Sequence, residues 1–262
     1  MKWARVDHDG TVHFAIVEGD MVQLVKGSPF DRFEVGLRLP LSGLKLLPPV
    51  IPGTFYAAGM NYVGHSEEMK DKLGAAKTAL PSKPDVGYRA NNALVGEGDD
   101  IIIPAASSGA VQYEPELVVV IGKRARNLSQ DEALSCVFGY TIGNDVSERT
   151  WQASDRTLWR AKNSDTFKPM GPWIETHIDL DKLMTRVRLN GQQIAEFATN
   201  QMIFGVARYI SEITKFITLH PGDVIWMGAN APTADMAPGD VIEVEIDGIG
   251  VLRNLVVAET VP

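Results

Sequence analysis

Two glutamates, one residue apart, open the most strand-like stretch of this 262-residue chain. Glu114 and Glu116 flank Pro115 and precede the apolar, β-branched run 117–121. Alternate residues of an extended chain share a face, so both carboxylates are expected to point the same way. Pro115 has no N–H to donate, which suits the start of a strand or an edge strand. Adjacent like charges repel, and a metal ion is the usual remedy; a solvated pair on an edge strand is the alternative.

A third carboxylate follows at the end of the next expected strand. Residues 139–146 run Gly-Tyr-Thr-Ile-Gly-Asn-Asp-Val, which places Asp145 at a strand terminus. Together with the two glutamates it would complete an all-oxygen cage. Such a cage suits a hard cation, Mg²⁺ or Mn²⁺, because zinc prefers nitrogen and sulfur ligands. A turn or helix-capping role is the alternative for Asp145.

A histidine and a glutamate three residues apart form a second candidate group. On a helix, His65 and Glu68 would share a face and touch. A carboxylate beside an imidazole orients it and raises its basicity, as a general base or water activator requires. An incidental ion pair on a surface helix is the alternative. Further along, Lys162 supplies a cation to a loop, 162–172, that proline and glycine are expected to make rigid.

Composition excludes several classes of protein. The net charge of −8, with no basic block, argues against a nucleic-acid partner and against an anionic membrane surface. The apolar runs are strand-sized, far below the ~20 residues that cross a bilayer, and the N-terminal residues show no secretory signal. The single cysteine, Cys136, rules out an internal disulfide and favours a reducing compartment. A cytoplasmic protein with no membrane contact is expected.

The chain divides into a small N-terminal β domain, residues 1–50, and a main domain, residues 51–262. Turn signals at 9–10 and 18–20 predict a β-meander, and a proline-marked linker at 47–53 leads into the main domain. A capping box at Ser129 predicts a helix that ends near Gly139. An apolar stripe predicts a second helix over 200–217 whose inner face is core. The polar stretch 70–86 is either a lid or a solvated loop.

Taken together, these segments resemble the fumarylacetoacetate hydrolase superfamily from about residue 55 to residue 257. The motifs that carry the resemblance occur in the family's order: Gly59-Met60-Asn61-Tyr62…His65…Glu68; Glu114-Pro115-Glu116; Asn144-Asp145-Val146-Ser147…Arg149…Gln152; Lys162…Asp165…Phe167…Pro169…Gly171-Pro172; Gly222-Asp223-Val224-Ile225; and Gly248-Ile249-Gly250. The resemblance implies a mainly β fold with some α (α+β), in which a mixed β-roll or barrel-like catalytic domain follows the N-terminal one.

The resemblance also implies roles for individual residues. It assigns the metal to Glu114, Glu116 and Asp145, with Mg²⁺ or Mn²⁺ as cofactor and Ca²⁺ as a substitute in a crystal. It makes His65 and Glu68 a water-activating dyad and Lys162 a catalytic residue. The side chains implied to face the substrate are Asn61, Tyr62, Arg149, Gln152 and Asn230. The partners implied are a small oxo-acid substrate and a second copy of the chain in a homodimer.

Two departures from the family pattern suggest a distinct substrate branch. Ala229 stands where the family commonly has a threonine that faces the substrate carboxylate, so recognition would pass to a neighbour such as Asn230 or Thr233. Upstream, the segment Tyr88-Arg89-Ala90-Asn91 replaces a common Lys-Pro near the site.

Three functions are compatible with these residues. The leading hypothesis is a metal-dependent hydrolase that cleaves a C–C bond in a 2-oxo or 1,3-diketo acid, such as an acylpyruvate, through an enolate. The alternative uses the same cage without an attacking water: decarboxylation of oxaloacetate, or isomerisation or hydration of a 2-hydroxydienoate. A protein that only binds a metal and an oxo-acid is the third possibility.

Overall fold

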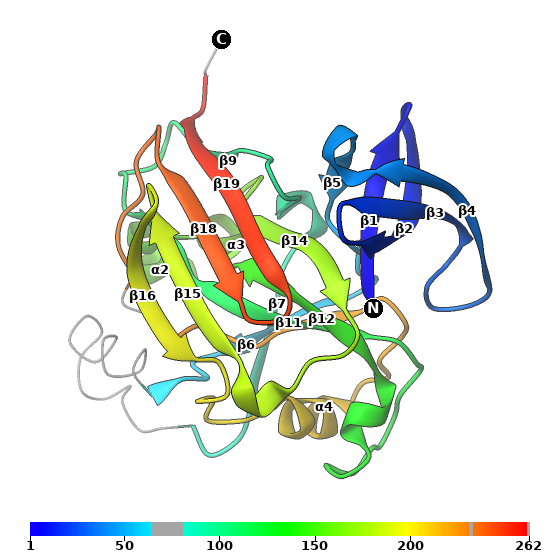
Figure 1. Cartoon of the computed structure of the whole chain (residues 1–262). Coiled ribbons are helices and arrows are strands. Elements are labelled where there is room, and N and C mark those ends of the chain that lie inside the picture. The colour runs from blue at the N-terminus through cyan, green and yellow to red at the C-terminus, as the bar shows by residue number, and fades with distance from the viewer. Residues whose placement is uncertain (64–80, 231–232, 261–262) are drawn as a thin grey trace.

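The computed structural model describes residues 1–63, 81–230 and 233–260. A large twisted sheet of 12 strands runs through the molecule, and a five-stranded sheet packs in front of it (Figure 1). Short helices lie at the ends of the strands. The chain is thus mainly β with some α, as the sequence predicts. Within the described residues, no helix is long and apolar enough to cross a membrane.

The N-terminal residues form the meander that the turn signals predict. Its elements are β1 (Lys2–His8), β2 (Thr11–Glu18), β3 (Met21–Gly27), β4 (Phe33–Pro40), the 3₁₀ turn Leu41–Gly43 and β5 (Lys45–Leu47). Strand β1 also pairs with β14 (Lys168–Glu175) of the main domain, through Lys2–Glu175 and Trp3–Ile174. The meander therefore continues the large sheet.

The rest of the large sheet carries the residues of interest. Its order from β1 onward is β14, β12 (Val137–Asn144), β11 (Pro115–Ile121), β17 (Val224–Trp226), β6 (Phe55–Gly59) and β7 (Asp85–Tyr88), with β8 (Leu94–Val95) paired to β14. Strand β11 is antiparallel to both β12 and β17, and all seven of its residues are buried. It is an interior strand, which excludes the edge-strand alternative for the glutamate pair.

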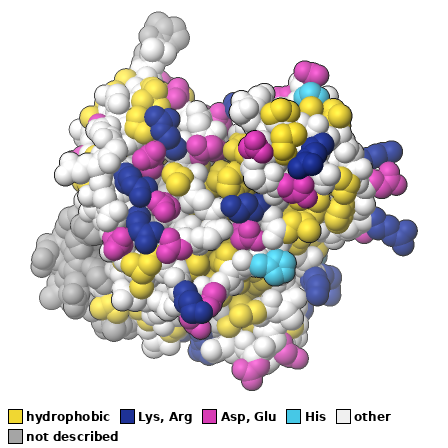
Figure 2. All heavy atoms as spheres, in the orientation of Figure 1, with side chains coloured by type: hydrophobic (Ala, Val, Ile, Leu, Met, Phe, Trp, Pro, Cys, Tyr) yellow, Lys and Arg dark blue, Asp and Glu magenta, His cyan; other side chains and the backbone are white. Residues whose placement is uncertain are grey.

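The second sheet has the order β16 (Gln192–Ala198), β15 (Met184–Leu189), β18 (Val241–Ile246), β19 (Gly250–Ala258) and β9 (Ile101–Ile103). Figure 2 shows basic and acidic side chains interspersed on its outer face. Cross-strand ion pairs such as Arg186–Glu196 and Arg188–Glu245 account for this pattern. A two-stranded ribbon of β10 (Val111–Gln112) and β13 (Ser147–Glu148) lies near the entrance of β11.

The helices are short: α2 (Arg149–Ser154), α3 (Trp159–Asn163) and α4 (Val206–Thr214), with 3₁₀ turns at Asn91–Ala93, Ala133–Cys136 and Leu180–Lys182. The predicted helix from Ser129 to Gly139 is wrong. The capping bonds form, since Glu132 N donates to Ser129 Oγ over 3.3 Å. However, the chain makes only a 3₁₀ turn, because Val137 onward is taken up by sheet pairing with β11.

The predicted helix over 200–217 is shorter than its apolar stripe. Gly205 caps α4, and Met202 instead forms a β-bridge with Tyr62, so the stripe begins in extended chain. Val206, Ile210 and Ile213 are buried, as predicted for its inner face.

Strand β11 separates two layers of the core. Its odd-numbered residues, such as Val119, pack in the cluster that contains α4 and part of the second sheet. Its even-numbered residues, Val118 and Val120, pack with Trp226 and with Trp3 of the meander. Glu116 shares the face of Val118 and Val120, so it extends the second layer toward the end of the strand.

Candidate active site

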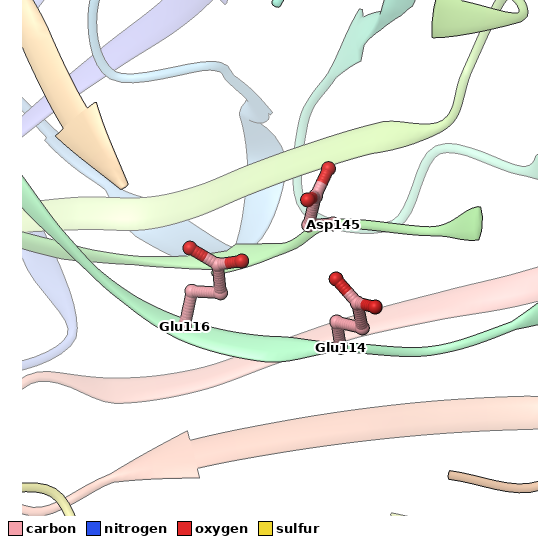
Figure 3. A group of neighbouring side chains, drawn as sticks. All are labelled: Glu114, Glu116 and Asp145. Atoms are coloured by element: carbon pink, nitrogen blue, oxygen red, sulfur yellow. The ribbon is translucent and has the colours of Figure 1, made fainter. Parts of the chain in front are cut away.

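The three predicted carboxylates meet at the entrance of β11. Glu114 and Glu116 rise from one face of this strand, and Asp145 stands just beyond the end of the neighbouring strand β12 (Figure 3). One oxygen from each residue lies within 4.8 Å of those of the other two, and all three side chains are buried. The alternation and strand-end arguments therefore place these side chains correctly. We call this group the carboxylate cage.

Strand pairing fixes the geometry of the carboxylate cage. Glu114 N donates to Asn144 Oδ1 over 2.9 Å, and Asp145 N donates to Glu114 O over 2.8 Å. Opposite Glu116 in the ladder lies Gly143. A Cβ at Gly143 would lie 2.6 Å from the ring of Trp226, so only glycine lets β12 approach this closely.

Two cations predicted from the sequence bind Glu114. Lys162 on α3 places Nζ 2.6 Å from Glu114 Oε2 and 2.8 Å from Asp145 Oδ2. Arg149, the first residue of α2, places Nη1 2.6 Å from Glu114 Oε1 and also donates to Gln152 Oε1 over 2.7 Å. Lys162 belongs to a short helix and not to the predicted rigid loop, of which residues 168–172 are in β14.

Two further cations, which no sequence pattern assigned to the site, bind Asp145. Arg89 donates from Nε to Oδ1 over 3.0 Å and from Nη2 to Oδ2 over 2.8 Å. Lys168, the first residue of β14, lies 2.8 Å from Oδ1 and has no exposed side-chain surface. Arg89 could have been found because it lies in the segment 88–91, which departs from the family's Lys-Pro near the site. Lys168 carried a weaker signal, a lysine within the apolar stretch 167–173.

Glu116 has a different environment from its neighbours. Its Oε2 accepts a hydrogen bond of 2.7 Å from Gly228 N, and no ion pair joins it to a described cation. Burial, together with the charges of Asp145 and Glu114, raises its pKa to about 8. A buried carboxylate compensated by one amide is costly unless a cation joins it.

The pKa of Asp145 is shifted in the opposite direction from that of Glu116. Burial alone would raise the pKa of Asp145, but the charges of Arg89, Lys162 and Lys168 outweigh burial and hold that pKa well below its usual range. Burial lowers the pKa of Lys168 to about 7 against the attraction of Asp145. The cage therefore combines Asp145, which pairs with three cations, with Glu116, which forms no ion pair with a cation in the described part of the chain.

A cavity of about 160 Å³ opens onto the carboxylate cage among the described residues. Its wall combines the cage, Arg89 and Lys162 with Gln152, Asn61 and an apolar side of Ala58, Met60, Leu158 and Ala229. Met60 and Leu158 have positive φ values of 33° and 57°, a conformation that non-glycine residues adopt mainly at constrained sites. A larger groove, of about 1020 Å³, is lined by Trp159 and residues 163–165 but contains none of the three carboxylates. The chemistry therefore belongs to the smaller cavity.

Of the residues predicted to face the substrate, some line the cavity and others lie outside it. Gln152 and Asn61 line the cavity, although the Asn61 amide also donates to the carbonyls of Phe204 and Met227. Tyr62 does not line the cavity: it is 1% exposed, and its hydroxyl donates to Thr199 O over 2.6 Å, which gives it a core position. Asn230 also lies outside the lining, with a 3.5 Å contact to Gln201 Oε1.

The predicted dyad of His65 and Glu68 lies outside the described residues, as does segment 70–80 of the predicted lid. The placement of these residues remains a prediction.

The donor set of the carboxylate cage fits a hard divalent cation. It offers only carboxylate oxygens, the ligands that Mg²⁺ and Mn²⁺ prefer. Glu116 provides the observation that tests the fit, because its buried carboxylate lacks a described counter-charge. Glu116 and Glu114 would hold such an ion, and Asp145 would join them through an oxygen it now shares with Lys162.

Comparison with known proteins agrees with this fold. Residues 54–257 match the family described as fumarylacetoacetate (FAA) hydrolase, C-terminal, and residues 1–49 match a family described as Rv2993c-like, N-terminal. The first match covers more than half of the chain. The chain belongs to the fumarylacetoacetate hydrolase family.

Relatives and solved structures with different reactions are similar to this chain. A mitochondrial oxaloacetate tautomerase of Xenopus laevis is 35% identical, over 84% of this chain and 70% of its own. The solved 5-carboxymethyl-2-hydroxymuconate delta-isomerase of Mycobacterium smegmatis is 32% identical with a TM-score of 0.89, covering 99% of this chain and 100% of that one. The fumarylacetoacetate hydrolase of Exiguobacterium antarcticum is also 32% identical, with a TM-score of 0.86 over 99% and 100%.

Proposed function

We propose that the protein is a divalent-metal-dependent enzyme that converts a small 2-oxo acid through its enolate, as a keto–enol tautomerase or isomerase. The observation that carries this proposal is the buried carboxylate cage, whose oxygens lie within 4.8 Å of one another and in which Glu116 lacks a described counter-charge. Mg²⁺ or Mn²⁺ bound there would act as a Lewis acid on the carbonyl oxygen of a 2-oxo acid.

The protein's own residues would orient the substrate and balance its charge. Lys162 lines the cavity with a buried ammonium, which can stabilise negative charge as it develops on the substrate oxygen. Gln152 is held by Arg149 and presents its amide to the same cavity, where it can orient a polar end of the substrate. The apolar wall at Leu158 and Ala229 keeps water from the reacting carbons.

The size of the cavity supports a small substrate. Its volume of about 160 Å³ is below the ~300–1,000 Å³ that is common for sites of drug-sized ligands. A short 2-oxo acid fits this description better than a long conjugated diacid. This favours substrates of the size of oxaloacetate, the compound named for the Xenopus relative.

Hydrolysis of a C–C bond in an acylpyruvate-type acid is the second candidate. The His65/Glu68 spacing favours it, because hydrolysis needs a base to activate water. The similarity to a solved fumarylacetoacetate hydrolase points the same way. We rank it second because the small volume of the cavity favours a short 2-oxo acid. A homodimer and a cytoplasmic location also remain proposals.

The decisive experiment follows solvent deuterium into the substrate. Metal-stripped protein, with and without Mn²⁺ or Mg²⁺, is incubated in D₂O with oxaloacetate and separately with an acylpyruvate, and products are followed by NMR. Glu116→Gln tests whether activity belongs to the cage, since a neutral amide is a poor ligand for a hard cation. Glu196→Gln, on the outer sheet, serves as the matched control.

The outcomes separate the candidates. Metal-dependent incorporation of deuterium at C3 without cleavage, lost in Glu116→Gln, supports the tautomerase. Release of pyruvate and a carboxylic acid from the acylpyruvate supports the hydrolase, and carbon dioxide from oxaloacetate supports a decarboxylase. Metal-independent exchange, or exchange that survives in Glu116→Gln, would overturn the proposal.

A further inference from the structure

The hydrogen bonds of Asp145 set it apart from the other two carboxylates. Its Oδ1 accepts from Arg89 Nε at 3.0 Å and lies 2.8 Å from Lys168 Nζ. Its Oδ2 accepts from Arg89 Nη2 and from Lys162 Nζ, each at 2.8 Å. An ionised carboxylate offers about four lone-pair sites. The side chains of three cations therefore use the whole acceptor capacity of Asp145.

Lys168 has no freedom to leave this position. Besides its contact with Asp145, its Nζ donates to Val146 O over 3.0 Å and to Phe167 O over 2.8 Å. A lysine ammonium has three donors, and all three are thus used. The side chain is fully buried at the start of β14, so no water can replace a lost partner without rearrangement.

Arg89 is held nearly as firmly. Its side chain is 7% exposed, and its planar fork meets Asp145 through two parallel hydrogen bonds. Its Nη1 also donates to the carbonyl of Tyr88, and its backbone N–H donates to Phe55 O in the neighbouring strand. A fork of this kind fixes the plane of a carboxylate as well as its charge.

Lys162 differs from Arg89 and Lys168 because its ammonium is divided between the carboxylates of two residues, Glu114 and Asp145. Lys162 and Arg89 both line the cavity, whereas its described lining does not include Lys168.

We infer that Arg89 and Lys168 are positioning residues that clamp Asp145. Arg89 Nε and Lys168 hold Oδ1, Arg89 Nη2 holds Oδ2, and the contact of Oδ2 with Lys162 is the one that would give way to a metal ion. The inference rests on the proposed metal site and adds to it two residues that act through Asp145. With its carboxylate held in this way, Asp145 would offer Oδ2 to the ion beside Glu114 and Glu116.

For removal of the Lys168 charge, the clamp and simple electrostatics predict opposite changes in metal affinity. Removing a positive charge near a metal site should tighten metal binding, because repulsion between the two cations is lost. Removing a group that orients a ligand should weaken binding, typically about 10–100-fold. The direction of the change therefore separates a positioning role from a purely electrostatic one.

The test measures Mn²⁺ affinity by titration calorimetry on metal-stripped protein, with the melting temperature recorded for each variant. Arg89→Lys keeps the charge but loses the fork, and Lys168→Met keeps the buried volume but loses the charge. Arg186→Lys is the matched control, since Arg186 also pairs with carboxylates, those of Glu196, Glu245 and Asp247, but lies on β15 of the second sheet. We expect about 10–100-fold weaker binding for Arg89→Lys and Lys168→Met and no change for the control.

The outcomes decide both claims separately. Unchanged or tighter Mn²⁺ binding by Arg89→Lys in a folded protein would overturn the clamp while leaving the metal site intact. Wild-type protein that binds no Mn²⁺ would overturn the metal site and the clamp with it. Should Lys168→Met fail to fold, Arg89→Lys decides alone, because it keeps the compensating charge beside Asp145.

Discussion

Among single residues, the uneven compensation of charge is the feature that shapes this site. Asp145 contacts three cations, whereas Glu116 accepts from one backbone amide. Asp145 and Glu116, both predicted from the sequence as metal ligands, thus have different electrostatic environments in the structure. Glu116 forms no ion pair with a described cation and would gain most from a bound metal ion, whereas Asp145 is held by Arg89 and Lys168.

Glu97, which does not belong to the carboxylate cage, shows how burial of a carboxyl group makes stability depend on pH. Burial raises the pKa of Glu97 to about 7, and Arg253 N donates to its Oε2 over 2.6 Å. Between about pH 4.5 and 7 the unfolded chain loses this proton while the folded chain keeps it, so stability falls as pH rises through this window. Glu97→Gln removes this fall in stability because glutamine does not ionise, and its side-chain oxygen can still accept the hydrogen bond from Arg253 N.

We therefore expect Glu97→Gln to be more stable than wild type at pH 8, by about 1–3 kcal/mol, and to match it near pH 4. Urea unfolding at both pH values measures the difference. Glu34→Gln, on an exposed strand, reports the general effect of removing a charge. Parallel stability curves for Glu97→Gln and wild type would contradict the expectation.

The sequence gives the chemistry-bearing residues more readily than their partners. Alternation predicted that Glu114 and Glu116 share a face, and a strand-end argument predicted the place of Asp145. The bond from Arg89 or Lys168 to Asp145 could not be predicted, because each joins segments 23 or more residues apart whose approach depends on sheet order. Tyr62 shows the converse, a motif residue whose hydroxyl serves the core.

Among the elements, strand β12 depends most strictly on one residue type, the glycine at position 143. Gly143 faces Glu116 in the ladder and lets the ring of Trp226 lie against the backbone, where a Cβ would come within 2.6 Å. The residue that positions the cage on this side is thus one that carries no side chain. The same strand explains why the helix predicted from Ser129 does not form: the pairing of Val137 with Ile121 outweighs local capping.

Gly143→Ala should consequently damage both the fold and the site. Relief of the clash must shift β12 or Trp226, and we expect a loss of about 2–4 kcal/mol in unfolding free energy with weakened Mn²⁺ binding. Denaturant unfolding and calorimetry measure the two effects. Gly43→Ala is the control, since no atom lies within 4 Å of a Cβ there. An alanine variant with wild-type stability would show that Trp226 yields more easily than we infer.

For the molecule as a whole, the notable feature is continuity between the meander and the main sheet. The sequence predicts a domain boundary near residue 50. In the structure β1 pairs directly with β14, and Trp3 packs in the same core layer as Trp226. Local turn signals revealed the meander. They could not reveal its attachment, because the Trp3–Ile174 pairing spans most of the chain.

This continuity predicts a single cooperative transition. Trp3 is 3% exposed and contacts Phe33 and Phe138 at ring-centroid distances of 4.9 and 6.2 Å. Trp3→Ala should cost about 3–5 kcal/mol and lower the one melting transition seen by calorimetry. Val12→Ala, at a half-exposed position, should change stability by less than about 0.5 kcal/mol. Two separate transitions would show that the meander unfolds independently.

The hydrogen bond from Gly228 N to Glu116 has a spectroscopic consequence. An amide proton that donates to a carboxylate over 2.7 Å resonates at a frequency that depends on the charge of its acceptor. In isotopically labelled protein, the Gly228 cross-peak should therefore move when Glu116 gains a proton and again when a cation shares its lone pairs. The fold thus contains a backbone reporter beside the carboxylate on which the proposed chemistry depends.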